Sequence, residues 1–334
     1  MRRVGLALGI GVILIITAWL GWVYGRHVAP AAPVVVVIAR GDSSAHIAAQ
    51  LKQAGVIHDA WAFEALVRLS GSASHLRSGY YRFADPSSIP HVMGRMLRGD
   101  VMHFSVTIPE GLRTDEVLAL LARDTGLPLA AWEQALGRLL PKAEWEGALL
   151  PETYEYEKPV DAGAMLARMI KAEQQVLKAA VAGEPGSDSA NQIRIIASII
   201  EKETHLDRER PLVSAVIRNR LARGMPLQMD PTVIYGIWAT EGSFSGDLHK
   251  ADMERDTPWN TYTRRGLPPT PVCNPGKASI MAAANPADVD YLYFVADGTG
   301  GHAFATTMAE HERNVQRWIR IYREQNGEPA AKGE

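Results

Sequence analysis

The sequence predicts an α+β protein with a single N-terminal transmembrane helix, a small α/β module, and a larger, mixed helical domain that ends in a β-hairpin. Three observations lead to this prediction. Residues 4–24 carry no charged side chain. Residues 34–99 alternate β-branched strand patterns with amphipathic helix patterns. Beyond residue 104, helix-like segments dominate until two strand-like runs flank a Gly-rich turn near residue 300. We therefore divide the chain into residues 1–27, 28–103 and 104–330.

The N-terminal segment has the length of a retained membrane anchor. Residues 4–24 are 21 uncharged residues. About 20 residues span the hydrocarbon core of a bilayer, whereas the apolar part of a cleaved signal peptide has about 7–15. Arg2 and Arg3 precede the stretch and only Arg26 follows it closely, so the positive-inside rule places the N-terminus in the cytoplasm. We expect a single-pass protein that contacts the lipid bilayer through residues 4–24 and exposes the remainder outside.

Residues 28–103 are expected to form a short linker followed by the small module. Residues 34–38 are a run of β-branched side chains, which is typical of a strand. Ser43 or Ser44 is suited to cap the helix that follows. In order, we expect a strand at 34–38, helices at 45–54 and 60–69, a strand at 79–83, and a helix that starts at Ser87 or Ser88 and ends near Gly99.

Residues 104–330 are expected to form the larger domain. Pro211 is suited to the first turn of a helix, Gly224 is suited to its end, and the proline-rich run 266–276 cannot lie inside a helix. In order, we expect a strand at 103–109, helices at 114–125, 127–140 and 160–182, a loop at 183–188, two helices between residues 193 and 224, a polar loop at 239–246, a hairpin formed by 291–296 and 302–305, and a terminal helix at 307–325.

The stretch from residue 193 to residue 235 carries the candidate chemistry. It begins as an apolar helix that runs directly into Glu201, Glu203 and Asp207. On a helix with about 100° per residue, Glu203 lies about 50° from the mean direction of the apolar side chains, and Glu201 lies about 110° from it. Glu203 is therefore expected to be half-buried. Burial raises the pKa of a carboxyl group, which suits a general acid that works near neutral pH.

Polar side chains follow this helix in a pattern that is typical of a sugar pocket. Gln228, Asp230, Thr232 and Tyr235 place hydrogen-bonding groups among apolar residues. Residues 259–262 add two aromatic rings and an asparagine amide, which can both donate and accept hydrogen bonds. We expect these two segments to grip a saccharide beside the candidate acid.

Four segments that follow one another in the chain carry a family resemblance. They read IASIIEKET, RNRLARGMPLQMDPTVIYG, NTYTRRGLPPTPVCNPG and YLYFVADGTGGHAF, between roughly residue 147 and the C-terminus. Together they resemble the MltG (YceG-like) family of membrane-anchored endolytic murein transglycosylases. The resemblance implies non-hydrolytic cleavage of the MurNAc–GlcNAc bond of peptidoglycan strands, with 1,6-anhydro-MurNAc ends, and termination or trimming of nascent strands. It also implies an inner-membrane protein with a periplasmic catalytic part, a LysM-like small module, peptidoglycan synthases as partners, and no cofactor or metal.

The resemblance places the catalytic glutamate within the EKET segment. We assign it to Glu203, because Glu-Thr is similar to the Glu-Ser of soluble lytic transglycosylases, which have a lysozyme-like active-site helix. The helix geometry, which places Glu203 nearer the apolar side than Glu201, agrees with this assignment. Glu201 is the fallback. Residues 145–154 are similar to a family segment in which an acid and an aromatic residue border the glycan groove. The residues expected to bind the strand are Gln228, Asp230, Tyr235, Asn260, Thr261, Tyr262, Glu152 and Tyr154.

A single acid is sufficient for the implied reaction. Glu201 and Glu203 cannot flank a scissile bond as a glycosidase pair, because side chains two apart on a helix diverge by about 200°. Glu203 would protonate the glycosidic oxygen and then accept the proton of the 6-hydroxyl that closes onto C1. Two alternatives stay open: a hydrolytic muramidase with Asp230 or Glu152 as the second carboxylate, and a non-catalytic, membrane-anchored scaffold that binds peptidoglycan. Read alone, the charges of residues 201–210 indicate only a solvated helix surface.

The composition excludes several other classes. With 47% apolar residues and a net charge of −2 in 334 residues, the chain has no basic excess that would indicate nucleic acid binding. The single cysteine, Cys273, excludes an intrachain disulfide and a multi-cysteine metal site. His311-Glu312 begins an HE pair, but no second histidine follows at the HExxH spacing of metalloproteases. His302 is expected to have a structural role.

Overall fold

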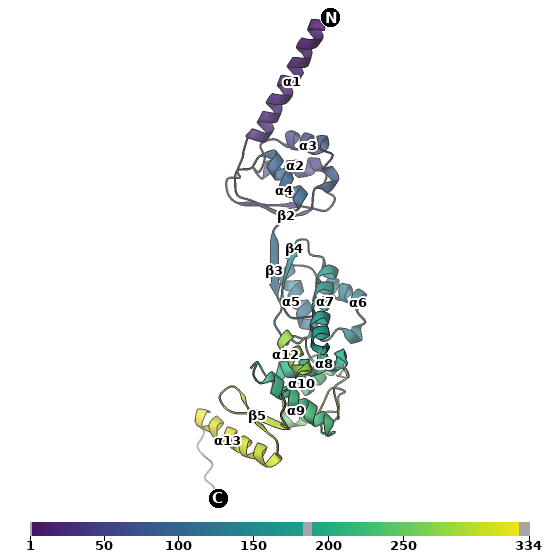
Figure 1. Ribbon diagram of the computed structural model, residues 1–334, viewed down its shortest axis with the longest axis vertical. Helices are drawn as coiled ribbons and strands as arrows, with labels where there is room; N and C mark the ends of the chain where they lie inside the picture. The colour runs from purple at the N-terminus through teal and green to yellow at the C-terminus, as the bar shows by residue number, and fades with distance from the viewer. Residues whose placement is uncertain (1, 183–188, 327–334) are drawn as a thin grey trace. The chain divides into compact units, whose positions relative to one another are not determined.

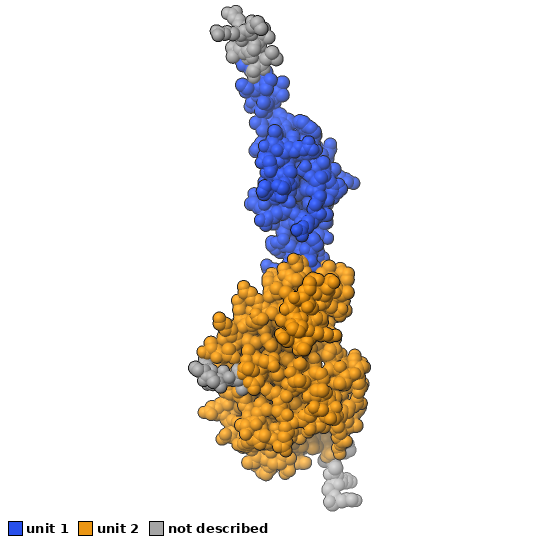
Figure 2. All heavy atoms as spheres, turned by 90° about the vertical axis from the view of Figure 1, so that its right-hand side faces the viewer, with its two compact units in different colours: residues 1–105, 155–160 blue, residues 106–154, 161–334 orange. Residues whose placement is uncertain are grey.

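The computed structural model describes residues 2–182 and 189–326, so the loop expected at 183–188 lies outside the described residues. The chain forms two compact units, which Figures 1 and 2 show. Strands β3 (His103–Thr107) and β4 (Thr153–Glu157) pair with one another, and the chain changes unit within each of them. The smaller unit comprises Met1–Ser105 and Glu155–Val160, and the larger unit comprises Val106–Tyr154 and Asp161–Glu334.

The smaller unit confirms the expected order of strand, helix, helix and strand. Its elements are α1 (Arg2–Gly25), β1 (Val34–Ile38), α2 (Ser44–Gln53), α3 (Ala60–Leu69), η1 (Ala73–His75), β2 (Gly79–Phe83) and α4 (Ile89–Arg98). β1 and β2 pair antiparallel, with Val34 opposite Phe83 and Ile38 opposite Gly79. Alternate strand residues share one hydrophobic core with α2, α3 and α4, as expected for a strand pair that is covered on one face (Figure 1).

Helix α1 exposes apolar side chains along the part of its length whose side chains are described. Ile13 and Ile15 are 63% and 70% exposed, and Trp22 and Tyr24 near its end are also exposed. Within the described residues, no helix is found that has both the length and the apolar character needed to cross a membrane. The transmembrane assignment of residues 4–24 therefore stays a prediction.

The larger unit confirms a mixed helical domain with a C-terminal β-hairpin. Its remaining elements are α5 (Thr114–Thr125), α6 (Leu129–Leu139), η2 (Lys142–Glu144), α7 (Ala162–Val181), α8 (Ala190–Glu203), α9 (Arg210–Ala222), α10 (Asp230–Glu241), α11 (Lys250–Met253), α12 (Lys277–Ala284), β5 (Tyr293–Ala296), β6 (His302–Ala305) and α13 (Met308–Asn326). β5 and β6 pair antiparallel, and α13 packs along this hairpin (Figure 1). The sequence did not predict β4, α10, α11 or α12. Helix α10 extends into the loop expected at 239–246, and Gly242 ends it in a left-handed conformation.

Helix α8 forms the centre of the larger unit. It packs against α7, α9, α10 and α12, and Ile195, Ser198 and Glu201 are buried in addition to the predicted apolar positions. A helix that is covered on nearly all sides has no single apolar face. Glu203 is half-buried as expected, but Glu201 is only 4% exposed. The angular comparison of the two glutamates did not predict this, because it assumed one buried face.

Both ends of α8 are fixed by side-chain hydrogen bonds. At its start, the Ser189 hydroxyl accepts from the Gln192 amide at 3.3 Å and the Gln192 side chain accepts from the Ser189 amide at 2.8 Å, which is a capping box. At its end, the Thr204 hydroxyl donates to the buried Glu209 carboxylate at 3.1 Å. Glu209 also accepts from the backbone amide of His302 at 3.0 Å and lies 2.7 Å from its Nδ1. His302 thus ties the hairpin to the point where α8 ends, which is a structural role.

A buried ion pair joins α7 to α8. Glu173 is 1% exposed, and Arg194 donates to both of its carboxylate oxygens, at 2.7 and 3.1 Å. Burial raises the pKa of Glu173, and the Arg194 guanidinium opposes that shift. The pair stabilises the contact between the helices only while both partners are present, because a single buried charge is strongly unfavourable.

We expect Arg194→Met to lower the free energy of unfolding by about 3–5 kcal/mol, because it leaves the Glu173 carboxyl buried without a counter-charge. Adding Glu173→Met should recover much of that loss. As a control, Arg123→Met breaks the exposed pair with Asp124 and should leave the free energy of unfolding unchanged. Urea unfolding at pH 7, followed by circular dichroism, measures all three variants. A loss below about 1 kcal/mol for Arg194→Met would contradict this account of the pair.

Candidate active site

A cavity of about 270 Å³ lies at the C-terminal end of α8. Four of the residues that the sequence singled out meet in it: Glu203, Gln228, Asp230 and Tyr262. They come from the end of α8, from the segment that opens α10, and from the loop before α12. The full lining is Glu203, Arg220, Leu227, Gln228, Met229, Asp230, Tyr262, Phe294 and His311.

Glu203 has the electrostatic environment of a general acid. Burial, and secondarily the charge of Asp230, raise the pKa of Glu203 to about 8. None of the described residues donates a hydrogen bond to its carboxyl group, so nothing on the protein side stabilises the ionised form. The group is therefore mostly protonated at neutral pH and faces a cavity, where it can give its proton to a bound molecule.

Asp230 is held in place by Tyr262. The Tyr262 hydroxyl donates to Asp230 Oδ1 at 2.6 Å. Burial and then this hydrogen bond raise the pKa of Tyr262, so the hydroxyl stays protonated and remains a donor. Asp230 is also the first residue of α10, where the helix dipole favours a negative charge. The carboxylate that acts on Glu203 is thus fixed in position.

Asn260 and Thr261 are buried and do not line the cavity, but they hold residues that do. The Asn260 side chain donates to the carbonyls of Met253 and Arg255, and its oxygen accepts from the Tyr262 amide at 2.8 Å. The Thr261 hydroxyl accepts from the Met229 amide at 3.0 Å. These bonds leave neither side chain facing the cavity, but they fasten the segment of Tyr262 to the start of α10.

Gln228 has a strained backbone at the edge of the cavity. Its φ angle is 54°, and it has the only positive φ among the described non-glycine residues. Its amide donates to the Thr261 carbonyl at 3.1 Å, and its side-chain oxygen accepts from Arg220 Nη1 at 3.2 Å. A residue other than glycine adopts this conformation at an energetic cost, so the surrounding bonds must hold it there.

Glu201, the fallback for the acid, does not line the cavity. Its Oε2 accepts from the Gly276 amide at 2.9 Å, and its Oε1 lies 3.7 Å from Arg210 Nη2. Arg210 in turn donates to the Ser279 hydroxyl and pairs with Asp207. Glu201 is therefore part of an ionic network that joins α8, α9 and α12, which indicates a structural role.

Three other expected binding residues also lie away from the cavity. Glu152 is exposed next to β4, and the Tyr154 hydroxyl donates to the Leu150 carbonyl at 2.7 Å. The Tyr235 hydroxyl donates to Glu146 Oε2 at 3.2 Å. Burial raises the pKa of Glu146 to about 7, although hydrogen bonds from Thr114 and Tyr235 oppose the shift. Glu146 was not predicted from the sequence, because it directly precedes the Gly-Ala-Leu-Leu run and has no local signal.

The sequence also did not predict that Arg220, Phe294 and His311 line the cavity. Arg220 comes from α9, Phe294 from β5 and His311 from α13, so the last two are about 90 and 110 residues from Glu203 in the chain. The His311 ring stacks on Tyr293, with 5.2 Å between ring centroids. Phe294 lies within the segments of the resemblance and His311 lies next to them. Their places in the cavity follow only from the packing of the hairpin and α13.

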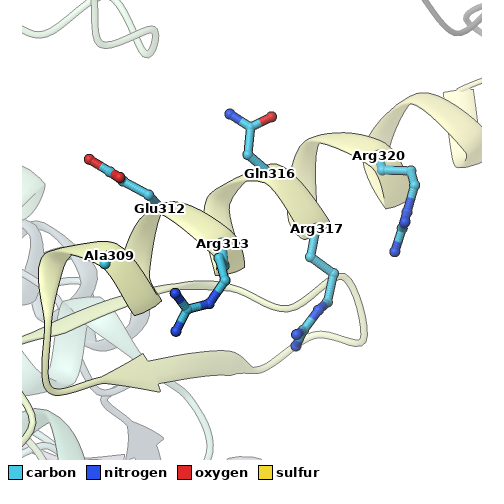
Figure 3. A pocket seen from close by; sticks show the side chains of 6 residues that line it. All are labelled: Ala309, Glu312, Arg313, Gln316, Arg317 and Arg320. Carbon is cyan, nitrogen blue, oxygen red and sulfur yellow. The ribbon is translucent and has the colours of Figure 1, made fainter.

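A second hollow runs along α13 and has different chemistry. It is lined by Ala309, Glu312, Arg313, Gln316, Arg317 and Arg320. Figure 3 shows the guanidinium groups of Arg313, Arg317 and Arg320 pointing to the same side of the helix. All three residues are exposed and the only acid in the hollow, Glu312, is exposed as well. The hollow therefore lacks a buried acid, and we interpret it as a solvated basic surface.

The chain is similar to known proteins along most of its length. The sequence profile of the YceG-like family matches residues 36–317. An endolytic murein transglycosylase from Bacillus subtilis (strain 168) is 29% identical over 309 residues, which cover 84% of each chain. An endolytic murein transglycosylase from Streptococcus pneumoniae is 27% identical over 322 residues, which cover 84% of this chain and 58% of that protein. The crystal structure of a YceG-like protein from Listeria monocytogenes matches with a TM-score of 0.52 and 29% identity, and covers 84% of this chain and 98% of that one.

We expect the Glu203 carboxyl group to titrate near pH 8 in the folded protein, because burial and Asp230 both disfavour its ionised form. Carbon-13 NMR of protein labelled at the glutamate carboxyls measures the midpoint, and Glu203→Gln identifies the resonance by its loss. Asp230→Asn should lower the midpoint, since it removes the neighbouring charge while the amide oxygen can still accept from Tyr262. Asp256→Asn, at an exposed aspartate paired with Arg264, should leave it unchanged. A midpoint near the ordinary value of 4.5 would show that Glu203 is solvated.

Proposed function

Because a family profile covers most of the chain, this protein belongs to the YceG-like family, and we propose that it is an endolytic murein transglycosylase. It is a lyase that cleaves the MurNAc–GlcNAc bond of peptidoglycan strands without water and leaves 1,6-anhydro-MurNAc ends. The names of the Bacillus and Streptococcus relatives support this activity. The observation that carries the proposal is the Glu203 carboxyl group at the wall of a cavity, where burial and Asp230 raise its pKa to about 8.

The reaction needs one proton to leave Glu203 and one to return. Glu203 protonates the glycosidic oxygen as the bond from C1 of MurNAc breaks, and GlcNAc leaves with a free hydroxyl group. The Glu203 carboxylate then accepts the proton of the 6-hydroxyl of the same MurNAc, whose oxygen bonds to C1. The acid is regenerated and no water is consumed. A pKa of about 8 suits both halves, because the group is protonated at pH 7 yet basic enough to take a proton back.

The arrangement of the other carboxyl groups argues against a two-carboxylate hydrolase. A hydrolase that inverts needs a second carboxylate free to activate water, and one that retains needs a free nucleophile. Glu152 is exposed next to β4 and does not line the cavity. Asp230 does line it, but Tyr262 donates to its oxygen at 2.6 Å. We therefore assign Asp230 to setting the pKa of Glu203 and Gln228 and Tyr262 to binding the strand.

We further propose that α1 anchors the protein in the cytoplasmic membrane, with the catalytic part in the periplasm. The support is its apolar surface, which continues into a hollow lined by Trp19 of α1 and by Trp61 and Leu69 of α3. Trp61 and Leu69 are 69% and 77% exposed. Exposed tryptophan beside an apolar helix is typical of a membrane interface. We also propose that the smaller unit is LysM-like and that the protein associates with peptidoglycan synthases. Both proposals rest on the family resemblance.

We expect Glu203→Gln to lower the release of anhydro-MurNAc fragments from purified sacculi by about 10²–10⁴-fold, because it removes the only proton donor at the bond that breaks. Mass spectrometry of the soluble fragments measures this release. Glu201→Gln should reduce it less, since Glu201 faces the Gly276 amide and Arg210 rather than the cavity.

The ends of the fragments separate the alternatives in the same experiment. Anhydro ends with the native chain support a transglycosylase, whereas reducing ends would identify a muramidase. If Glu203→Gln released fragments at the native rate, the protein would not use this residue as its acid. Circular dichroism of each variant confirms that the comparison is between folded proteins.

We expect the full chain to sediment with membranes and to resist extraction by high salt, because α1 offers apolar rather than charged contacts. Replacing both Ile13 and Ile15 by Asp should release the protein, since each change puts a charge into the apolar surface. Exchanging each for Leu is the matched control and should leave the protein in the membrane fraction. Recovery of the native chain in the soluble fraction would contradict the anchor.

A further inference from the structure

The cavity contains a buried guanidinium group without a carboxylate partner. Arg220 is 7% exposed and lines the same cavity as Glu203. Its Nε donates to the Leu292 carbonyl at 2.6 Å, and its Nη1 donates to the carbonyls of Pro226 and Leu227 at 3.2 and 2.8 Å. Among the described residues, no carboxylate pairs with Arg220 and no protein oxygen accepts from its Nη2. The Nη2 atom itself is not fully buried.

A buried cation in this state has spare capacity to bind an oxygen ligand. Charged side chains are rarely buried unless they are paired, because the loss of hydration is costly. Burial lowers the pKa of Arg220, and charge interactions with Tyr293 and Tyr262 act in the opposite direction. The Nη2 group therefore offers a strong, unused donor, and hydrogen bonds from arginine to carboxylate or carbonyl oxygens are among the strongest in proteins.

His311 contacts the same tyrosine ring as this guanidinium. Arg220 lies over the Tyr293 ring at 5.2 Å, and His311 stacks on the same ring at 5.2 Å between centroids. His311 Nδ1 is buried and has no partner among the described residues, which leaves Nε2 for the cavity. Burial and then the charge of Arg220 lower the pKa of His311, so its ring is neutral at pH 7 and does not repel the guanidinium. The two side chains form one polar corner of the cavity.

We propose that this corner, Arg220 with His311, recognises the lactyl group of MurNAc. The inference rests on the proposed function. GlcNAc and MurNAc differ only in the lactyl ether at O3, which ends in a carboxyl group that is free or joined to a peptide. In both forms it presents oxygen acceptors and no cation. Glu203 must act at C1 of MurNAc, so the sugar that carries the lactyl group has to occupy the cavity beside it.

This assignment gives Arg220 a specificity-determining role. A strand shifted by one sugar would place GlcNAc beside Glu203, and the Nη2 donor would then lose the lactyl oxygens that accept from it. The loss of a hydrogen bond from a charged donor disfavours that register. The corner therefore directs the cut to the MurNAc–GlcNAc bond rather than to the GlcNAc–MurNAc bond.

The test compares two tetrasaccharides that differ in the lactyl group. The full chain with Glu203→Gln binds without cleaving, and calorimetry measures its affinity for the peptide-free (GlcNAc-MurNAc)₂ and for chitotetraose, which has GlcNAc only. We expect the MurNAc-containing ligand to bind at least about tenfold more tightly, in line with a hydrogen bond from a charged group. Adding Arg220→Gln should reduce this preference to below about threefold, and His311→Phe should reduce it in part. Arg313→Gln, which removes an exposed guanidinium from the same helix as His311, should preserve it.

Two results would overturn the inference. Equal affinity of the Glu203→Gln protein for both ligands would show that the lactyl group is not recognised. A loss with Arg220→Gln that is the same for both ligands would show that Arg220 only holds the carbonyls of residues 226, 227 and 292. Digestion of sacculi by the wild-type protein tests the proposed function separately. Anhydro ends in that digest would support the transglycosylase activity even if Arg220 did not recognise the lactyl group.

Discussion

The burial of the Glu203 carboxyl group near the charge of Asp230 is the constraint on which the rest of the structure depends. Burial and the charge of Asp230 both favour the protonated form of Glu203, and no described donor opposes them. Glu209 shows the contrast within the same unit. Burial acts to raise its pKa, but hydrogen bonds from His302 and Thr204 lower it below the ordinary value. Two partly or fully buried glutamates six residues apart therefore differ in protonation because of their hydrogen-bond donors.

The scaffold keeps Glu203 in this unfavourable setting. Helix α8 is covered by four other helices, and the bonds from Thr204 and His302 to Glu209 fix the point where it ends. Asn260 and Thr261 hold the segment of Tyr262 against the start of α10. Thr204, Glu209, Asn260 and Thr261 are buried and lie outside the cavity. Their shared effect is to hold Asp230 and Tyr262 in the same cavity as Glu203.

Local signals predicted most of the elements, while tertiary packing decided the site. The sequence predicted β1, β2, α3 and α5 at their observed bounds, because β-branched runs, caps and glycines act within a few residues. It also predicted that Glu203, Gln228, Asp230 and Tyr262 belong together, through the family resemblance. It did not show that Asn260 and Tyr235 turn away from the cavity, since composition identifies polar residues and not the side on which they lie. Arg220 and His311 were missed because only the packing of the hairpin and α13 places His311 in the same cavity as Arg220 of α9.

The central claim is that the 6-hydroxyl of the substrate, and not water, attacks C1 after Glu203 gives its proton. Digestion of sacculi in water enriched in oxygen-18, followed by mass spectrometry of the new MurNAc ends, tests this directly. The account predicts ends of unchanged mass, because no oxygen from the solvent enters the product. Ends that gain one oxygen-18 atom on cleavage would contradict it.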